Sequence, residues 1–392
     1  MPAEWSPQSA VYMAWPHLQS TWSHHCEPAR KAVMDIIAIM QKFQTVKLLV
    51  RCQEMDNVKC RFMPAEEWKN VMFVEATYDD IWLRDTGPTF LKKRIPNDAG
   101  SGAGSNGRSG DVVSDPGNLL AMRWTFNAWG NKHDNYANDM TVSGRIAHSA
   151  AVDEVQCPQI LEGGSFHTNG NGTFLTTEEC LLHSNRGTLI VEDSVFCDKD
   201  GGKGRRTKEQ MTTVFQQYLN AHKIIWLPYG VHGDDDTDGH VDNIACFISP
   251  NKVVLTMPTD SNHVQYPKSM AAKSILESST DVNGQPLEVI CLPHPTGPSM
   301  IITEEDVAHL DVGAIDRHVG AQMAGSYINF YIGNSFVVLP QFGSPEDEVA
   351  KEILQQHMKH TGHTVFGVNT RAILLGGGNI HCITQQEPSG CL

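Results

Sequence analysis

The sequence predicts an α/β fold that repeats one small module of strands, and two observations support this prediction. First, residues 161–168 (LEGGSFHT) align without a gap on residues 375–382 (LGGGNIHC), which indicates an internal repeat of one supersecondary unit. Second, amphipathic segments with helical spacing each precede a short apolar run that is typical of a strand. We therefore expect strand modules on the inside that are joined through helices on the outside.

Three further segments are variants of the repeated unit, so the chain contains five candidate modules. Most of the modules combine a strand, a turn rich in Asn, Gly or Pro, and a second strand. In a repeat arranged around an axis, corresponding positions of the modules converge on that axis. The three further segments are residues 78–92, 240–257 and 326–340.

Three helices are predicted, and each stands before a strand. The first carries apolar residues at helical spacing. The second begins with Thr207 as N-cap and has Gln210 at the capping-box position. The third opens with Ser344 as N-cap, Pro345 at the first helical position and acidic residues in the first turn. The predicted pairs are helix 27–43 with strand 46–50, helix 207–218 with strand 224–227, and a helix from residue 344 with strand 364–366.

Composition excludes several classes of partner. The formal net charge of −15 opposes nucleic acid binding and favours cations. No apolar run approaches the roughly 20 residues that span a bilayer, and the first residues lack the basic and apolar regions of a signal peptide. The ten cysteines include no Cys-x-x-Cys pair, so we expect reduced thiols and a cytoplasmic location. Residues 95–117 and 191–206 are predicted to be flexible surface insertions without a chemical role.

Ionisable residues stand at corresponding places in four of the modules, within or next to predicted strands. Each of them alone has an ordinary structural explanation. A lone Asp is commonly a turn residue, a lone His a hydrogen-bonded structural residue, and a lone Cys a small buried hydrophobe. The functional explanation is stronger for the whole set, because the repeat brings these places to one axis. The set is Cys382, His240, Glu162, Asp85 and Asp242.

One thiol, one imidazole and three carboxylates suit attack on a cationic electrophile. Acyl transfer stabilises a developing negative oxygen, which nearby anions would hinder. A guanidinium instead presents its N–H donors in a fixed fork that carboxylates match bidentately. We therefore expect Asp85 and Asp242 to grip a guanidinium while Cys382 attacks its central carbon. His240 would protonate the departing ammonia and then activate a water, with Glu162 orienting the imidazole.

The same carboxylates predict the charge of the nucleophile. Three nearby anions raise the pKa of Cys382 above the ordinary value of about 8.5. Our hypothesis is that this thiol is largely neutral until a cationic substrate arrives.

Two metal sites are the alternatives to this chemistry. Residues 234–239 (DDDTDG) match the opening of an EF-hand loop, but position twelve is Ala245 instead of a glutamate, and the flanks read as strands. Zinc at Cys382, His240 and an aspartate lacks recognisable ligand spacing. We expect no metal and no cofactor.

Seven segments that cover nearly the whole chain outside the insertions together resemble the agmatine deiminase (agmatine iminohydrolase) family. Together they form a highly specific set of motifs. They are residues 82–88 (WLRDTGP), 126–130 (FNAWG), 161–165 (LEGGS), 233–243 (GDDDTDGHVDN) and 377–386 (GGNIHCITQQ), with residues 1–5 (MPAEW) and 326–332 (SYINFYI).

This resemblance implies a fold and a reaction. The fold is the five-bladed α/β propeller (pentein) of the guanidine-modifying superfamily, with pseudo-fivefold ββαβ modules around a central active site and residues 1–392 in a single catalytic domain. The reaction is hydrolysis of agmatine to N-carbamoylputrescine and ammonia in putrescine synthesis. By resemblance Cys382 is the nucleophile, His240 the general acid/base and Glu162 the family's glutamate. Asp85 and Asp242 clamp the guanidinium, Trp82 packs on the substrate, and Asp236 lies where agmatine is contacted.

Several alternatives stay open at this point. Within the same chemistry they are deimination of arginine or peptidyl-arginine and amidino transfer to an amine. An arginine substrate would require a basic residue against its carboxylate, and the motifs offer only Arg84. A noncatalytic polyamine-binding or calcium-binding module is the alternative of a different class. A homodimer is one assembly that we consider, and nothing in the sequence decides the oligomeric size.

Overall fold

The computed structural model describes residues 1–93, 118–187, 206–310 and 317–390. The predicted insertion 95–117 lies outside these residues, and so does 191–206 except for its last residue. That residue, Arg206, is buried, and its Nη1 donates to the Ile160 carbonyl at 2.7 Å. Among the described residues, no helix has both the length and the apolar character needed to cross a bilayer.

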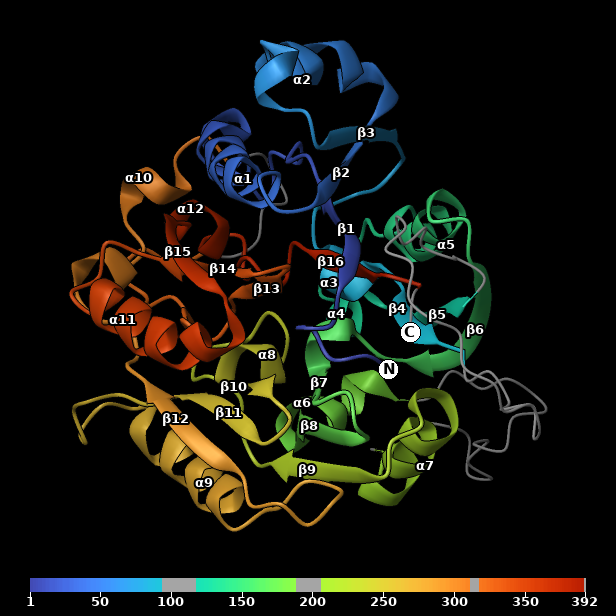
Figure 1. Cartoon of the computed structure of the whole chain (residues 1–392). Coiled ribbons are helices and arrows are strands. Elements are labelled where there is room, and N and C mark those ends of the chain that lie inside the picture. The colour runs from blue at the N-terminus through green and yellow to red at the C-terminus, as the bar shows by residue number, and fades with distance from the viewer. Residues whose placement is uncertain (94–117, 188–205, 311–316, 391–392) are drawn as a thin grey trace, which may run out of the picture.

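The strands of the described residues form five small sheets arranged in a ring (Figure 1). Within each sheet an antiparallel pair is followed by a parallel neighbour, and a helix leads across to that neighbour. The sheets are β16-β1-β2-β3, β4-β5-β6, β7-β8-β9, β10-β11-β12 and β13-β14-β15. This arrangement confirms the predicted five-bladed α/β propeller. The strands are β1 (Gln8–Ala14), β2 (Thr45–Val50), β3 (Val71–Glu75), β4 (Thr89–Lys92), β5 (Leu119–Thr125), β6 (Asp153–Ile160), β7 (Phe166–Thr168), β8 (Thr173–Thr177), β9 (Lys223–Leu227), β10 (Ala245–Ser249), β11 (Lys252–Thr256), β12 (Glu288–Leu292), β13 (Tyr331–Gly333), β14 (Phe336–Gln341), β15 (Thr364–Asn369) and β16 (Gln385–Pro388).

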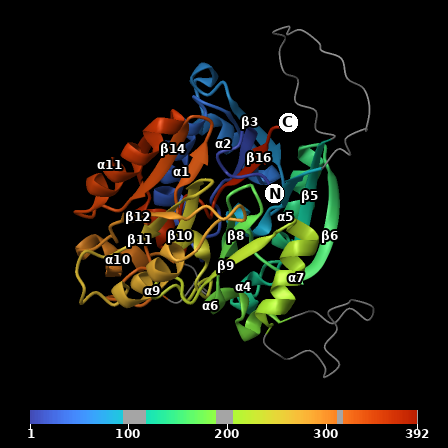
Figure 2. The ribbon, with the colours of Figure 1, turned by 60° about the horizontal axis from the view of Figure 1, so that its bottom comes forward.

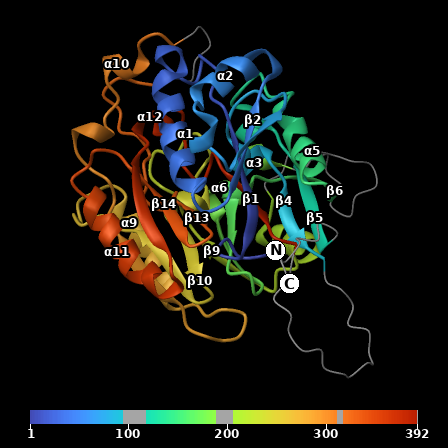
Figure 3. The ribbon, with the colours of Figure 1, turned by 45° about the horizontal axis from the view of Figure 1, so that its top comes forward.

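The longer helices cover the outside of the ring. Both rotated views show α11 on the outer side of β14 (Figures 2 and 3). Helix α1 illustrates the cause, because its apolar residues at positions 29, 32, 33, 36, 37 and 40 are all buried against the strands. Burying each larger side chain of this kind contributes about 1.5–3 kcal/mol. These helices are α1 (Glu27–Met40), α5 (Asp139–Ser149), α7 (Lys208–Leu219), α9 (Tyr266–Glu277) and α11 (Asp347–Met358), with α2 (Met55–Arg61) beside β3.

Two short helices of one turn correct the sequence prediction. Residues around Asp85 and before Cys382 were read as strands, whereas Leu83–Thr86 and Arg371–Leu374 are helical. A short apolar run fits either period, so periodicity alone does not separate the two structures. The one-turn helices are α3 (Leu83–Thr86), α4 (Ala128–Asn131), α6 (Glu178–Leu181), α8 (Val241–Ile244), α10 (Glu304–Val307) and α12 (Arg371–Leu374).

The predicted helix ends are confirmed in one case and wrong in another. Thr207 and Gln210 form the reciprocal capping box that begins α7. Helix α11, however, begins at Asp347 with Glu346 as its N-cap, and not at Ser344. The reason is visible in the contacts, because the Ser344 hydroxyl faces the Thr296 carbonyl at 2.8 Å and the Glu346 carboxylate instead of the helix backbone.

Candidate active site

Cys382 lies in the loop between α12 and β16, where neighbouring elements fix both its backbone and its sulfur. Its Sγ accepts a hydrogen bond from Asn329 Nδ2 at 3.1 Å and lies 3.6 Å from Asp242 Oδ2. The Asn329 side chain also accepts from the backbone N–H groups of His381 and Cys382 through Oδ1. The sulfur is therefore buried but held in one place next to a carboxylate.

His240 stands immediately before α8 with its ring fully buried between two carboxylates. Its Nδ1 lies 3.8 Å from Asp85 Oδ2, and its Nε2 lies 3.7 Å from Glu162 Oε2. Neither ring nitrogen has a hydrogen-bond partner among the described residues, and the same holds for Glu162 Oε2 and Asp242 Oδ1. Buried polar atoms are normally paired, so four orphaned atoms around one point indicate a place for a polar ligand.

The three carboxylates are held by different partners. Asp85 accepts from the Gly164 backbone N–H at 2.9 Å and from the Trp129 indole at 2.8 Å. Glu162 accepts from Arg186 Nε at 2.9 Å. Asp242 lies 2.8 Å from His381 Nδ1. All five residues that the sequence predicted for the reacting centre are therefore brought together, although their roles remain predictions.

The charges of these groups follow from burial and from the partners. Burial alone disfavours every charged form, yet Arg186 lowers the pKa of Glu162 to about 2. The Asp85 carboxylate, Cys180 and Glu162 together outweigh burial and raise the pKa of His240 well above its ordinary value. Burial, with Asp242 and Asp85, raises the pKa of the Cys382 thiol well above its ordinary value. Both shifts have the direction that favours an imidazolium at His240 and a protonated thiol at Cys382.

Glycines of the repeated motif allow the close approach of these side chains. A Cβ at Gly164, in the single turn η5 (Gly163–Ser165), would lie 2.6 Å from His240 Nδ1 and 2.9 Å from Asp242 Oδ2. A Cβ at Gly378 would lie 3.0 Å from Cys382 Sγ and 2.6 Å from the Trp82 ring. The two aligned glycine runs therefore give backbone, and not side chain, to the wall of the site.

We expect the Gly164→Ala variant to lose most activity, because the added methyl overlaps the imidazole and displaces either His240 or Asp242. A misplacement of about 1 Å can cost on the order of 100-fold in rate. The measurement is kcat/KM for ammonia release beside the melting temperature. Gly144→Ala is a control for the substitution itself, since Gly144 has no positive φ and a Cβ there would meet only the ends of the Glu154 and Arg123 side chains, at 3.2 Å or more. Equal activity of Gly164→Ala and wild type would contradict the geometry.

A narrow pocket leads to Cys382 between two tryptophans, Trp82 and Trp129, with Asp236 also in its wall. Asp80 holds the Trp82 indole at 3.1 Å and the Trp22 indole at 3.0 Å, so one buried carboxylate fixes both rings. The cavity volume is about 20 Å³, close to the room of a single water, so side chains must move to admit a larger ligand.

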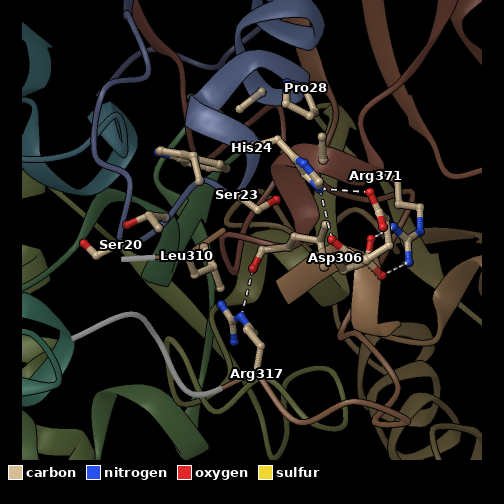
Figure 4. Close-up of a pocket in the computed structure, with 14 residues that line it drawn as sticks. Ser20, Ser23, His24, Pro28, Asp306, Leu310, Arg317 and Arg371 are labelled. Carbon is tan, nitrogen blue, oxygen red and sulfur yellow. Dashed lines mark hydrogen bonds and ion pairs between the residues drawn. The ribbon is translucent and has the colours of Figure 1, made fainter. Parts of the chain in front are cut away.

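Asp236 is paired in this structure with a residue that the sequence prediction missed. Arg317 Nη1 lies 3.1 Å from Asp236 Oδ2, and its Nε donates to the Leu375 carbonyl at 2.8 Å. Arg317 also lines a second pocket of about 190 Å³ next to the first, drawn in Figure 4 with His24, Asp306 and Arg371. Trp22 lines the second pocket, and its ring contacts that of Trp82, which lines the first.

The loop that resembled a calcium site uses its acids for contacts within the protein. Asp234 accepts from the Thr237 hydroxyl and backbone and from Asn243. Asp238 pairs with Arg186 and, at 2.8 Å, with Lys132. Since Asp236 pairs with Arg317, each of the three acids at alternate loop positions already has a protein partner. This arrangement disfavours the calcium-binding alternative.

Four residues that contact the site escaped sequence reasoning. Asn329 stands inside the apolar run 326–332, and a lone amide in such a run was the available signal. Trp129 lies in a segment that was noted only for its resemblance. Arg186 and Arg317 carried no signal, because each lies outside the motifs and reaches its partner through tertiary structure.

Comparison with known proteins gives consistent results across the chain. A family model described as Porphyromonas-type peptidyl-arginine deiminase matches residues 1–388. The agmatine deiminase of Pseudomonas syringae pv. tomato is 37% identical over 397 residues, which cover 99% of this chain and 95% of that protein. The agmatine deiminase of Medicago truncatula is 36% identical over 99% of this chain and 96% of its own. The solved structure of agmatine deiminase of Enterococcus faecalis superposes with a TM-score of 0.82 at 31% identity, over 100% of this chain and 96% of that one.

Proposed function

This chain belongs to the Porphyromonas-type peptidyl-arginine deiminase family, and we propose that it acts as an agmatine deiminase, which hydrolyses agmatine to N-carbamoylputrescine and ammonia in putrescine synthesis. One observation carries the proposal beyond relatedness. The Cys382 sulfur lies 3.6 Å from Asp242, the His240 imidazole lies between Asp85 and Glu162, and a buried oxygen of Asp242 and one of Glu162 have no partner among the described residues. A planar cation with several N–H donors is the ligand that these acceptors would satisfy.

The first half of the proposed reaction forms a covalent intermediate. Asp85 and Asp242 bind the guanidinium N–H groups and leave its central carbon open to the Cys382 sulfur. The cation also lowers the thiol pKa, so the thiol proton passes to solvent as the carbon–sulfur bond forms. His240 protonates one nitrogen of the tetrahedral adduct, that carbon–nitrogen bond breaks, and ammonia departs. An S-alkylthiouronium on Cys382 remains.

The second half returns the free enzyme. His240, now neutral, removes a proton from a water that attacks the thiouronium carbon. The carbon–sulfur bond breaks, the thiolate takes the hydroxyl proton of the adduct, and the ureido product leaves. Glu162 supports both steps by facing His240 Nε2 as a carboxylate that Arg186 keeps ionised. Trp82 packs on the substrate in this proposal, as a wall of the pocket.

Asp236 is proposed to bind the ammonium tail of agmatine at the pocket mouth. Arg317 pairs with Asp236 and matters for this assignment. An arginine substrate needs a basic residue to bind its carboxylate, and Arg317 is such a residue, although the sequence motifs did not contain it. An amino acid head carries an ammonium and a carboxylate, which complement Asp236 and Arg317 respectively. Arginine is therefore the second candidate substrate, and the ion pair at the mouth is the observation that favours it.

The deciding experiment measures ammonia release with agmatine, arginine and peptidyl-arginine in parallel. We expect turnover of agmatine at a kcat/KM well above that for the other two. Turnover of arginine at a similar rate would show that Asp236 and Arg317 together bind the ammonium and the carboxylate of an amino acid. Absence of ammonia release from all three would refute the proposed reaction class.

We expect iodoacetamide to alkylate Cys382 slowly at neutral pH in the ligand-free enzyme, because burial and two carboxylates raise the pKa of the thiol. The alkylation rate should keep rising as the pH increases above about 8.5, the ordinary pKa of a cysteine thiol. The rate of carboxamidomethylation at Cys382, followed by mass spectrometry, provides the titration. A midpoint well below pH 7 would make the neutral-thiol hypothesis wrong.

The setting of the reaction is also a proposal. All the cysteines among the described residues are free thiols, which suits the reducing cytoplasm. We propose a cytoplasmic enzyme, with a homodimer as the assembly that light scattering would test.

A further inference from the structure

A buried row of charged groups continues beneath Asp242, away from the substrate pocket. His381, the residue before Cys382, has Nδ1 at 2.8 Å from Asp242 Oδ2 and Nε2 at 2.8 Å from Glu4 Oε1. The Glu4 side chain is itself buried and comes from the segment before β1. Residues at the two ends of the chain are therefore joined in one row of Glu4, His381 and Asp242, which ends 3.6 Å from the Cys382 sulfur.

The two short contacts decide the protonation of His381. A neutral imidazole has a single N–H and can donate to only one carboxylate, whereas the imidazolium donates from both nitrogens. Since ionised carboxylates only accept, His381 between Glu4 and Asp242 is doubly protonated. Burial and Arg84 oppose this charge, but Glu4 and Asp242 outweigh them and raise the pKa of His381. The site thus contains a second imidazolium besides that of His240.

We propose that Glu4 is a positioning residue which, through His381, keeps Asp242 ionised and aimed at the substrate. The inference rests on the proposed function of Asp242 as a guanidinium ligand. The His381 proton donated at Nδ1 occupies Asp242 Oδ2, which leaves Oδ1 free for the guanidinium. The other titratable or charged groups that face this row are Arg84, His167, Tyr331, Asp85, His240, Cys246 and Cys382.

A metal centre is the alternative explanation of this cluster, because ligand atoms of Glu4, His167 and His381 lie within 4.8 Å of one another. The hydrogen bonds argue against it. The Phe247 backbone N–H donates to His167 Nδ1 at 3.3 Å, so the ring proton of His167 lies on Nε2 and faces Glu4 Oε2 at 3.3 Å. A metal needs a lone pair on that nitrogen. The contacts therefore describe an ion cluster held by hydrogen bonds.

The test is the Glu4→Gln variant, which keeps the shape and a hydrogen-bond partner for His381 but removes the charge. We expect kcat for agmatine to fall about 10- to 100-fold, as when an outer partner of a reacting side chain is removed. We also expect a new loss of activity with rising pH around the ordinary imidazole pKa of about 6.5. The sign follows because the variant lowers the pKa of His381, so that Asp242 loses its cation as pH rises through the lowered value.

A second readout does not depend on agmatine. Loss of the His381 cation leaves the Asp242 charge uncompensated beside the sulfur, so Cys382 alkylation at about pH 8 should be slower in Glu4→Gln than in wild type. If wild type released no ammonia from agmatine, the proposed reaction would be wrong. If wild type and Glu4→Gln were alkylated at equal rates, only the proposed role of Glu4 would be wrong.

Two controls separate positioning from stability. His167→Gln removes a partner of the same Glu4 carboxylate without touching Asp242, so it should share any loss in melting temperature and keep the wild-type pH dependence. Glu66→Gln changes an exposed glutamate and should match wild type throughout. The proposal is overturned if Glu4→Gln keeps the wild-type pH profile and alkylation rate, whether or not its melting temperature falls.

Discussion

The Cys382→Ala variant should release ammonia from agmatine on the order of 10⁶-fold more slowly than wild type, because no other group can form the covalent intermediate. Cys382 is the thiol among the residues that line the described pocket, and its Sγ lies 3.6 Å from Asp242 Oδ2. The carboxylates that bind the guanidinium stay in place, so agmatine should still bind. Ammonia release and calorimetric binding of agmatine measure the two properties separately.

The wild-type protein allows the covalent intermediate itself to be detected. Acid quenching during turnover should trap an adduct on Cys382 with the mass of agmatine less ammonia. Cys52→Ser provides the matched control, because Cys52 is an exposed free thiol far from the site in sequence, and it should retain activity. An alanine variant that still turns over agmatine would rule out nucleophilic catalysis by this residue.

The Arg186→Met variant should lose about 3–5 kcal/mol of unfolding free energy at neutral pH, the typical cost of removing one partner of a buried ion pair. Both Arg186 and Glu162 are fully buried and lie 2.9 Å apart. The same guanidinium also donates to the carbonyls of Trp129 and Thr237, each at 2.9 Å, and pairs with Asp238. Urea denaturation followed by tryptophan fluorescence measures the difference.

The pH dependence of this loss has a definite sign. In wild type, the pKa of Glu162 is lowered to about 2, so its pairing stabilises the fold above the unfolded value of about 4.3 and loses that effect as pH falls towards 2. In the variant, burial without Arg186 favours the neutral acid. The stability difference between the two proteins should therefore shrink on acidification below about pH 4.3.

A surface ion pair supplies the comparison for Arg186. Arg123 and Glu154 lie 2.7 Å apart but are partly exposed, and such pairs contribute about 0–1 kcal/mol. Arg123→Met should therefore cost far less than Arg186→Met. Equal effects of the two substitutions would mean that the buried pair is not what stabilises this region.

Local patterns predicted the repeat and the convergence of its polar residues. The aligned glycine runs and the strand-turn-strand segments follow from short-range signals, which the blade around β13 and β14 reproduces directly. The capping box of α7 is another such signal. Cys382, His240, Glu162, Asp85 and Asp242 could be predicted to meet because the repeat placed them at equivalent positions.

Partners brought in by tertiary structure could not be predicted in the same way. Arg186 and Arg317 lie outside any motif, and only the folded ring brings them to Glu162 and Asp236. The one-turn helices α3 and α12 were read as strands, because four apolar or mixed residues are too few to distinguish the two periods. The pairing of β1 with β16 could not be predicted from the sequence either, since the register between distant strands depends on the complete sheet.

The ring closes where β16 pairs with β1, and Ser9 contacts Glu387 across a separation of 378 positions. During synthesis, β1 leaves the ribosome with its place beside β16 empty, and the first blade stays incomplete until residues 385–388 have been made. Such a distant contact is slow to form because a long loop must close first. The nucleophile emerges only just before the closing strand, so nascent chains interrupted at any earlier codon cannot release ammonia from free agmatine in the cell.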